Sequence, residues 1–409
     1  MDCIQKITPD IYWVGGSDRR LALFENMFPL ENGVTYNAYV ILDEKTALVD
    51  TVDSAIRQQF FENLHAALGG RSPDYLVVNH MEPDHCAHIE DICRIWPNVK
   101  IVGNAKTFQM IRQFYNMDLE GRTHEVNECT ELSLGRHTLR FYMAPMVHWP
   151  EVMFTYETSE NILFSADAFG TFGGFTGNLF SDETDYAHLY MDESRRYYTN
   201  IVGKYGQQVL SALKKLSDQK ISLICPLHGP VLRGNDISVL LEKYTRWASY
   251  RPEKAGVLLA YASMYGNTEA VVHRLAGLLS QKGIHDLRIY DVSKTHYSEI
   301  IARAFQYSHW VLASPTYNMH LYQAMESLVD DMANLNLQNR GAVVIGNGSW
   351  SPAAHTLLQK KVEAMKNMDL IADPFVIRSA MKSEQEAELE GIADKLAASV
   401  KKAEATVKN

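Results

Sequence analysis

From residue 255 onward the chain alternates between two patterns so regularly that few folds can accommodate it. Short apolar runs such as GVLLAYAS, WVLASPT and AVVIGN are separated by amphipathic stretches such as EAVVHRLAGLLSQKG and AMESLVDDMANL. Strands that are apolar along their whole length are buried on both faces, and the helices between them provide the cover. Five strand and helix units therefore predict an α/β domain with a doubly wound, parallel, five-stranded sheet.

The first 250 residues have a different organisation, because they are rich in strand-like runs. TYNAYVIL, YLVVNH, TLRFYMAP, NILFSAD and SLICPLHGP have the apolar, β-branched and aromatic character of strands. Helix-like stretches such as SAIRQQFFENLHAAL and GQQVLSALKKLSD lie between them. Pro252 and its charged neighbours mark a linker near residues 250–255. We expect two domains, 1–250 and 255–409, each long enough to bury its own core.

Charge and composition exclude several classes of partner. Acidic residues number 49 against 39 basic ones, which gives a formal charge of −10 and argues against nucleic acid or an anionic membrane surface as a partner. The N-terminal stretch lacks the basic and apolar regions of a signal peptide, and no apolar run approaches the roughly 20 residues of a membrane span. Five widely spaced cysteines without a CxxC pair argue against a disulfide framework. We expect a cytoplasmic protein.

Potential metal ligands follow several predicted strands of the first half. The segment YLVVNHMEPDHCAHIED places four of them directly after a strand, and three more follow later strands. Imidazole and carboxylate groups are ligands for borderline and hard metal ions, and strand ends hold such groups rigidly. A surface loop would explain the first cluster alone but not the others. The expected metal ligands are His80, Glu82, Asp84, His85, His148, Asp167 and His228.

The pattern HxExDH, followed by separated His, Asp and His residues, resembles the metallo-β-lactamase fold, an αββα sandwich whose zinc hydrolases carry HxHxDH. Glu82 replaces the second histidine of that motif. Its hard anionic oxygen favours iron over zinc, which prefers nitrogen and sulfur.

The resemblance implies a pair of iron ions. One iron would bind His80, Glu82 and His148, and the other Asp84, His85 and His228. The Asp167 carboxylate would bridge the two ions. His88 lies outside the motif and is expected to be structural. Aromatic residues are expected to form an apolar wall around the pocket, namely Trp149, Phe169, Phe172 and Phe175.

In the second half, the first strand runs into the turn SMYGNT and then into a helix. Ser263, Asn267 and Thr268 offer hydrogen-bond donors, Gly266 permits a tight turn, and the N–H groups at the helix start suit a phosphate. An ordinary capped helix start is the alternative. The turn is neither GxGxxG nor GxxxxGK[ST], so NAD and ATP are disfavoured.

The TxxGNT-like turn resembles that of flavodoxin, which binds FMN. Two further loops, SPTYNMH and GNGSWSPAA, follow the third and fourth strands, where open α/β sheets bind ligands. Trp350 could cover a planar ring. The resemblance implies FMN contacts from three loops: Ser263, Met264, Tyr265, Gly266, Asn267 and Thr268; Ser314, Pro315, Thr316, Tyr317 and Asn318; and Gly346, Asn347, Gly348, Ser349 and Trp350.

A diiron β-lactamase-like domain followed by a flavodoxin-like domain resembles the flavodiiron proteins over nearly the whole chain. That family reduces dioxygen to water, nitric oxide to nitrous oxide, or both, in the cytosol. The resemblance implies two iron ions and FMN as cofactors, a separate rubredoxin-like electron carrier as partner, and a head-to-tail homodimer or a dimer of dimers.

Two alternatives belong to other functional classes. The first is a metal-dependent hydrolase with a flavodoxin-like regulatory module, which Glu82 and the number of carboxylates disfavour. The second is a flavin-based redox sensor without turnover, which the full set of metal ligands disfavours. Metal analysis would separate them, because zinc supports hydrolysis and two irons per chain support reduction.

Overall fold

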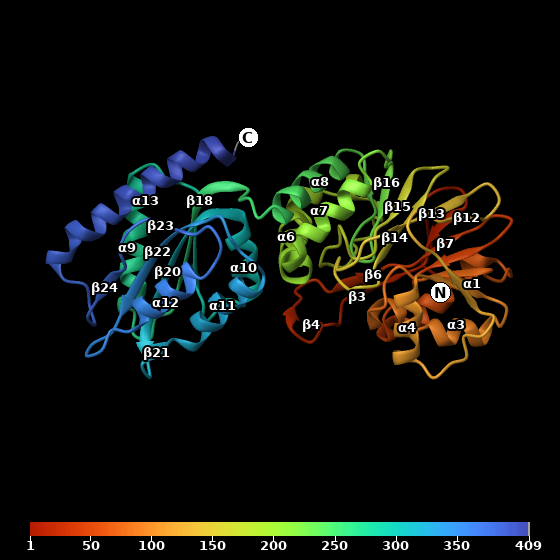
Figure 1. Ribbon diagram of the computed structural model, residues 1–409, viewed down its shortest axis with the longest axis horizontal. Coiled ribbons are helices and arrows are strands. Elements are labelled where there is room, and N and C mark those ends of the chain that lie inside the picture. Colours follow the sequence, from red (N-terminus) through yellow and green to blue (C-terminus); the bar gives the residue numbers. More distant parts are fainter. Residues whose placement is uncertain (408–409) are drawn as a thin grey trace. The chain divides into compact units, whose positions relative to one another are not determined.

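The computed structural model of the protein describes residues 1–407. The chain divides into two compact units, one ending at Thr245 and the other beginning at Arg246 (Figure 1). Within residues 1–407, no helix combines the length and the apolarity that crossing a membrane requires.

The N-terminal unit is built on two sheets that pack face to face. The first has the strand order β1-β2-β7-β8-β9-β10-β11, and the second has the order β12-β13-β14-β15-β16-β17. The first sheet contains β1 (Gln5–Lys6), β2 (Ile11–Trp13), β7 (Tyr39–Ile41), β8 (Ala47–Val49), β9 (Tyr75–Val77), β10 (Lys100–Gly103) and β11 (Thr123–Glu125). The second contains β12 (Glu131–Ser133), β13 (Thr138–Met143), β14 (Met153–Glu157), β15 (Ile162–Phe164), β16 (Leu223–Cys225) and β17 (Leu232–Arg233).

Apolar side chains of the two sheets meet in one core. Tyr39 and Val77 from the first sheet and Phe141 and Phe164 from the second are at most 1% exposed and belong to the same cluster. Such a core removes a large apolar area from water and fixes one sheet on the other. The rigidity matters because the candidate ligands come from both sheets.

Helices cover the outer faces of this sandwich. Contacts of α1 with β7 and of α4 with β10 place these helices on the first sheet, and α7 contacts β13 of the second. The predicted αββα sandwich is therefore confirmed. The helices of the unit are α1 (Arg57–Leu68), α2 (Pro83–Cys86), α3 (Ile89–Ile95), α4 (Ala105–Phe114), α5 (Tyr186–Leu189), α6 (Met191–Tyr197), α7 (Gly206–Lys215) and α8 (Asn235–Ala248), the last of which crosses the division between the units.

Two small strand pairs lie outside the main sheets. Strand β3 (Gly16–Asp18) pairs with β6 (Val34–Tyr36), and β4 (Leu23–Phe24) pairs with β5 (Phe28–Pro29) in a short hairpin. The sequence patterns did not predict these pairs, because strands of two or three residues leave too little alternation to recognise.

The C-terminal unit is a parallel sheet with the strand order β19-β18-β20-β22-β23. The predicted doubly wound sheet is confirmed, with its fifth position shared by β23 and β24, which pair with successive parts of β22. Its strands are β18 (Lys254–Tyr261), β19 (Leu287–Asp291), β20 (Tyr307–Tyr317), β22 (Gly341–Asn347), β23 (Asp369–Leu370) and β24 (Phe375–Ile377), and β21 (His320–Leu321) pairs with the end of β20.

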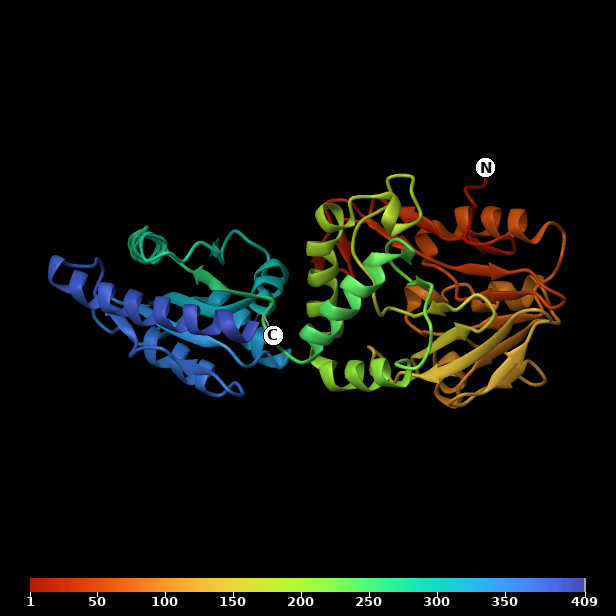
Figure 2. The same cartoon turned by 90° about the horizontal axis from the view of Figure 1, so that it is seen from above.

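Helices lie on both faces of this sheet (Figure 2). On one face, α9 and α13 contact each other and β18. On the other face, α10 contacts α11, and α11 contacts α12. The helices are α9 (Asn267–Gln281), α10 (Tyr297–Gln306), α11 (Gln323–Asn334), α12 (Ala354–Glu363) and α13 (Glu386–Val407).

Candidate metal centre and flavin cavity

Strand ends of both sheets of the N-terminal unit meet at the candidate metal centre. Strands β13, β15 and β16 run in the same direction, because β14 is antiparallel to both β13 and β15 and β15 is parallel to β16. Their carboxyl ends therefore lie at one edge, where they are followed by His148, Asp167 and His228. The loop after β9 of the first sheet brings the remaining ligands to the same place.

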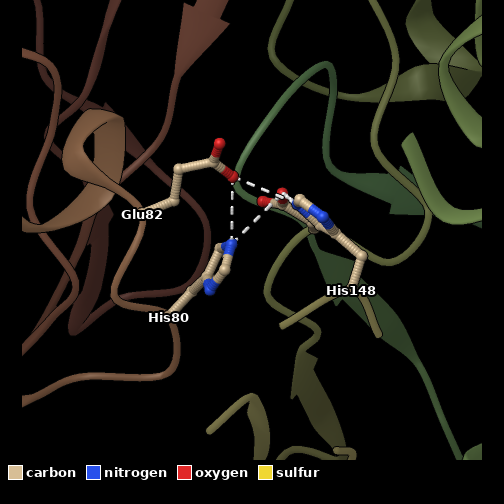
Figure 3. A group of neighbouring side chains, drawn as sticks. His80, Glu82 and His148 are labelled. Atoms are coloured by element: carbon tan, nitrogen blue, oxygen red, sulfur yellow. Dashed lines mark hydrogen bonds and ion pairs between the residues drawn. The ribbon is translucent and has the colours of Figure 1, made fainter. Parts of the chain in front are cut away.

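The first group of candidate ligands is His80, Glu82 and His148, whose side chains point toward one another in Figure 3. Glu82 Oε2 lies 3.2 Å from His80 Nε2 and 3.1 Å from His148 Nε2. His80 is fully buried, and His148 is 8% exposed. Two imidazole nitrogens and a carboxylate oxygen around one point can hold a metal ion.

The second group is Asp84, His85 and His228. His85 Nε2 lies 3.0 Å from His228 Nε2, and Asp84 Oδ2 lies 3.2 Å and 3.4 Å from these two nitrogens. Both histidines are buried to 1% exposure or less. Two ring nitrogens can face each other this closely around a cation, since each offers it a lone pair.

Asp167 connects the two groups, because each of its carboxylate oxygens faces one of them. Oδ2 lies 3.1 Å from His148 Nε2 and 3.6 Å from His80 Nε2. Oδ1 lies 3.2 Å from His85 Nε2 and 3.8 Å from His228 Nε2. The structure thus brings all seven predicted ligands together in the two groups that the motif implied.

The electrostatics of the centre are those of a site built for cations. Burial alone would lower the pKa of both His85 and His148. The carboxylates of Asp84 and Asp167 instead raise the pKa of His85 to about 10, and those of Asp167 and Glu82 raise the pKa of His148 to about 9. Both carboxylate oxygens of Asp84 and the Oδ1 atom of Asp167 are buried and have no hydrogen-bond partner within residues 1–407. A buried carboxylate oxygen without a partner is costly, so the donor set fits bound metal ions.

Residues behind the ligands hold the histidine rings in place, and the sequence patterns did not identify them. Glu151, which is fully buried, accepts a hydrogen bond from His80 Nδ1 at 2.8 Å, and the Thr35 carbonyl accepts one from His228 Nδ1 at 2.7 Å. Each bond places the proton on Nδ1 and leaves Nε2 free to bind a metal. The only available signal for Glu151 was its position three residues after His148.

An open cavity of about 520 Å³ leads to the metal centre. Leu23, Phe24 and Tyr36 line it, and it reaches Glu82 and Asp84. Tyr197 is fully buried nearby, with its ring 5.4 Å from that of His228 and its hydroxyl without a hydrogen-bond partner within residues 1–407. The centre is therefore accessible to a small molecule.

None of the four residues of the expected aromatic wall is among the lining residues of this cavity. The Trp149 ring lies 5.3 Å from that of His80, and Phe172 packs 5.1 Å from Tyr197. Phe169 packs against Tyr244 and Phe175 against Trp13, so these two residues contribute to the core.

Two other histidines near carboxylates have structural surroundings. His88 stacks on Phe60 at 5.8 Å, as expected for a structural residue. His137 lies near Asp10 and Glu160, but the Arg136 guanidinium already bonds to both carboxylates. This third group is an ion-pair network around an arginine.

The C-terminal unit has a cavity of about 430 Å³ at the carboxyl ends of β18, β20 and β22. Twelve of the predicted FMN contacts line it: Ser263, Met264, Tyr265, Asn267, Thr268, Pro315, Thr316, Asn318, Asn347, Gly348, Ser349 and Trp350. The other predicted contacts, Gly266, Ser314, Tyr317 and Gly346, are not among its lining residues, whereas Met319, Ser351 and Ser379 line it without having been predicted.

The turn before α9 has the geometry of a phosphate cradle. Gly266 adopts a positive φ of 89° directly before the helix, and its N–H and that of Glu269 donate to Ser263 Oγ. The first turn of α9 thus presents Asn267 and Thr268 to the cavity. Because Gly266 and Glu269 already donate to Ser263, the N–H groups of Asn267 and Thr268 are the ones that fit the phosphate of FMN at this helix start.

Comparison with known proteins agrees with this architecture. The family described as ODP family beta lactamase matches residues 34–229, and the flavodoxin family matches residues 259–406. A nitric oxide reductase of Moorella thermoacetica is 34% identical over 90% of this chain and 91% of its own length.

Two solved structures match nearly the whole chain. The rubredoxin oxygen:oxidoreductase of Desulfovibrio gigas superposes with a TM-score of 0.91 at 27% identity and covers 98% of this chain and 99% of its own. The flavodiiron protein of Giardia intestinalis shares the fold with a TM-score of 0.92 at 24% identity, covering 98% of each chain.

A β-lactamase-like unit with paired metal groups, followed by a flavodoxin-like unit, defines an oxidoreductase that couples a metal centre to a flavin. The chain belongs to the flavodiiron protein family. Membership of this family assigns two non-haem iron ions to the N-terminal unit and FMN to the C-terminal unit.

The loop of His228 leads to a prediction about how the centre is built. Gly229 has a φ of 82°, and a Cβ there would overlap the Thr171 side chain, whereas Gly234 has a φ of 63° and open space around it. We expect Gly229→Ala to destabilise the protein by about 3 kcal/mol and to reduce bound iron, since strain and overpacking add. Gly234→Ala should cost only about 1 kcal/mol.

Denaturant unfolding and metal analysis of both variants would check this prediction. Gly234→Ala controls for the left-handed conformation alone. Equal losses of stability and of iron in the two variants would show that the close packing behind His228 is unimportant.

Proposed function

We propose that the protein reduces nitric oxide to nitrous oxide at the diiron centre, with electrons that arrive through FMN from a separate carrier. The observation that carries this proposal is the pair of ligand groups joined by the Asp167 carboxylate. The 34% identical relative named nitric oxide reductase supports nitric oxide as the substrate.

Dioxygen reduction to water is the second candidate activity. It is favoured by the close superposition with the rubredoxin oxygen:oxidoreductase. Coupling of two nitric oxide molecules consumes two electrons and two protons and releases nitrous oxide and water, whereas reduction of dioxygen to two waters consumes four of each. When bound, a reduced diiron pair supplies two electrons and open coordination positions, and reduced FMN supplies two more. Side-by-side consumption assays with both gases would decide between the two activities.

The protein's own residues provide the geometry for this chemistry. Glu151 and the Thr35 carbonyl hold His80 and His228 with Nε2 toward the centre. Leu23 and Phe24 give the cavity an apolar part that suits an uncharged diatomic gas, and the carboxylates of Glu25 and Asp53 also line it. We propose that the protein acts in the cytoplasm, where the cysteines would remain reduced.

The metal ligands and the flavin cavity belong to different units, so we expect that each cofactor can be lost without the other. Asp167→Ala should remove at least one iron per chain while FMN is retained, because the shared carboxylate is lost. Thr268→Ala should weaken FMN binding while both irons are retained, because Thr268 lines the flavin cavity and belongs to the C-terminal unit. Iron analysis and the flavin absorbance of each variant are the measurements. An Asp167→Ala protein with two irons and full activity would contradict the assignment.

The electron source can be tested directly. Within the sequence there is no GxGxxG turn and no rubredoxin-like CxxC pair, so we expect NADH alone to reduce the flavin poorly. Addition of a rubredoxin and its NADH-dependent reductase should produce fast reduction. The measurement is flavin bleaching in a stopped-flow instrument, and rapid stoichiometric reduction by NADH alone would refute a separate carrier.

We further propose a head-to-tail homodimer, or a dimer of such dimers, in which the FMN of one subunit serves the diiron centre of its partner. Each cavity is built within one unit, and each has exposed apolar side chains nearby, including Trp350 and Tyr265 at the flavin cavity and Leu23 at the metal cavity. Exposed apolar groups of this kind favour contact between protein surfaces. A two-fold axis would form both contacts at once.

Complementation between inactive variants tests this arrangement. Asp167→Ala and Thr268→Ala subunits, mixed under conditions that allow exchange, should recover gas reduction, since one interface of the mixed dimer regains an intact pair of cofactors. Wild-type protein taken through the same exchange is the control. Verified mixed dimers that stay inactive would place the electron transfer within one chain.

A further inference from the structure

The C-terminal unit has a second cavity, at the edge of its sheet opposite the FMN cavity. It lies where strands begin, beside His309 of β20, Gly341 of β22 and Asp369 of β23. Its volume is about 390 Å³, close to the 430 Å³ of the FMN cavity. All of its lining residues belong to the unit that begins at Arg246.

The charge of this cavity is opposite to that of the chain. Four cationic side chains line it, Arg246, Arg251, Arg340 and Lys402, against the single carboxylate of Asp369. The whole chain has a formal charge of −10. Arg251, Arg340 and Lys402 form no ion pair within residues 1–407. Cations gathered in a concave site attract anions more strongly than the same charges on a flat surface.

Arg340 places a positive charge in the wall of the cavity with no anion in contact. It is 2% exposed, and its guanidinium donates to main-chain carbonyls: Nε to Ala304, Nη1 to Tyr250 and Gln338, and Nη2 to Phe305. Burial lowers the pKa of Arg340 to about 9. Nη2 makes one of its two possible hydrogen bonds within residues 1–407.

The neutral groups beside these cations are also hydrogen-bonding groups. His309 is 3% exposed, with Nδ1 2.7 Å from Ser308 Oγ and Nε2 2.9 Å from Ser399 Oγ. Burial lowers the pKa of His309 to about 4, so the imidazole is neutral near pH 7. Arginine and lysine at the rim with amide and hydroxyl groups between them are the usual surroundings of a bound phosphate.

We propose that this cavity binds a small molecule that carries a phosphate or diphosphate group, separately from FMN. The rim cations Arg251 and Lys402 would contact the phosphate oxygens, and Arg340 would supply the buried positive charge behind them.

The proposal is tested with the FMN-loaded full-length protein. Inorganic pyrophosphate is titrated by calorimetry at constant ionic strength, with AMP as a second probe that distinguishes a nucleotide from a free phosphate compound. Arg251→Glu combined with Lys402→Glu removes both rim cations, which are exposed and not needed for packing. The matched control is Lys395→Glu with Lys401→Glu, which makes the same charge change on exposed positions of α13 outside the cavity.

We expect the wild-type protein and the control to bind one pyrophosphate per chain, and the rim variant to bind at least ten-fold more weakly. Unchanged flavin absorbance during the titration shows that FMN has not been displaced. Tighter binding of AMP than of pyrophosphate would identify a nucleotide site, and the reverse a site for free phosphates. The proposal is overturned if neither probe saturates the wild-type protein, if the rim variant binds as tightly as the wild type, or if the control loses as much affinity.

Discussion

The shared carboxylate of Asp167 is the constraint on which the N-terminal unit depends. It is 1% exposed, and its two oxygens face imidazole nitrogens delivered by both sheets of the sandwich. A buried carboxylate is tolerated only where cationic partners lie close by. The sandwich must therefore hold its two sheets in a fixed relation, and the mixed core of Tyr39, Val77, Phe141 and Phe164 does so.

Some of the residues with a strained backbone lie beside the two sites. Met146, Ala166 and Phe169, which neighbour His148 and Asp167, have positive φ angles of 64°, 49° and 68°. At the flavin cavity, Met319 and Ser379 have φ angles of 66° and 63°. Side chains rarely adopt this conformation, and it persists where the surrounding packing enforces it. These five residues lie in turns that follow strands, next to the side chains that form the two sites.

The sequence patterns predicted those features that repeat along the chain and those whose residues lie close together in it. The parallel sheet followed from ten alternating segments, and the seven metal ligands followed from one compact motif and three strand ends. Glu151 and the Thr35 carbonyl were not predictable, because their roles depend on loops that are brought to His80 and His228 only by the packing of the two sheets.

The flavin loops show the same limit. The three loops were recognised from their positions after strands, but their individual contacts were not. Ser379 reaches the cavity because β24 lies beside β22, and its hydroxyl lies 2.7 Å from that of Ser349. Tyr317 instead lines a neighbouring depression beside Tyr322. Which side of a loop faces the ligand depends on its local φ and ψ angles, which composition does not fix.

Glu82 has a consequence beyond the choice of metal. The two ligand groups contain three carboxylates, those of Glu82, Asp84 and Asp167. A histidine in place of Glu82 would leave two. Each anionic oxygen ligand stabilises the more highly charged oxidation state of an iron ion, and net charge is one of the means by which a protein tunes a reduction potential. With iron bound, this single side chain would therefore make the reduced centre a stronger electron donor than a histidine-rich site in the same fold.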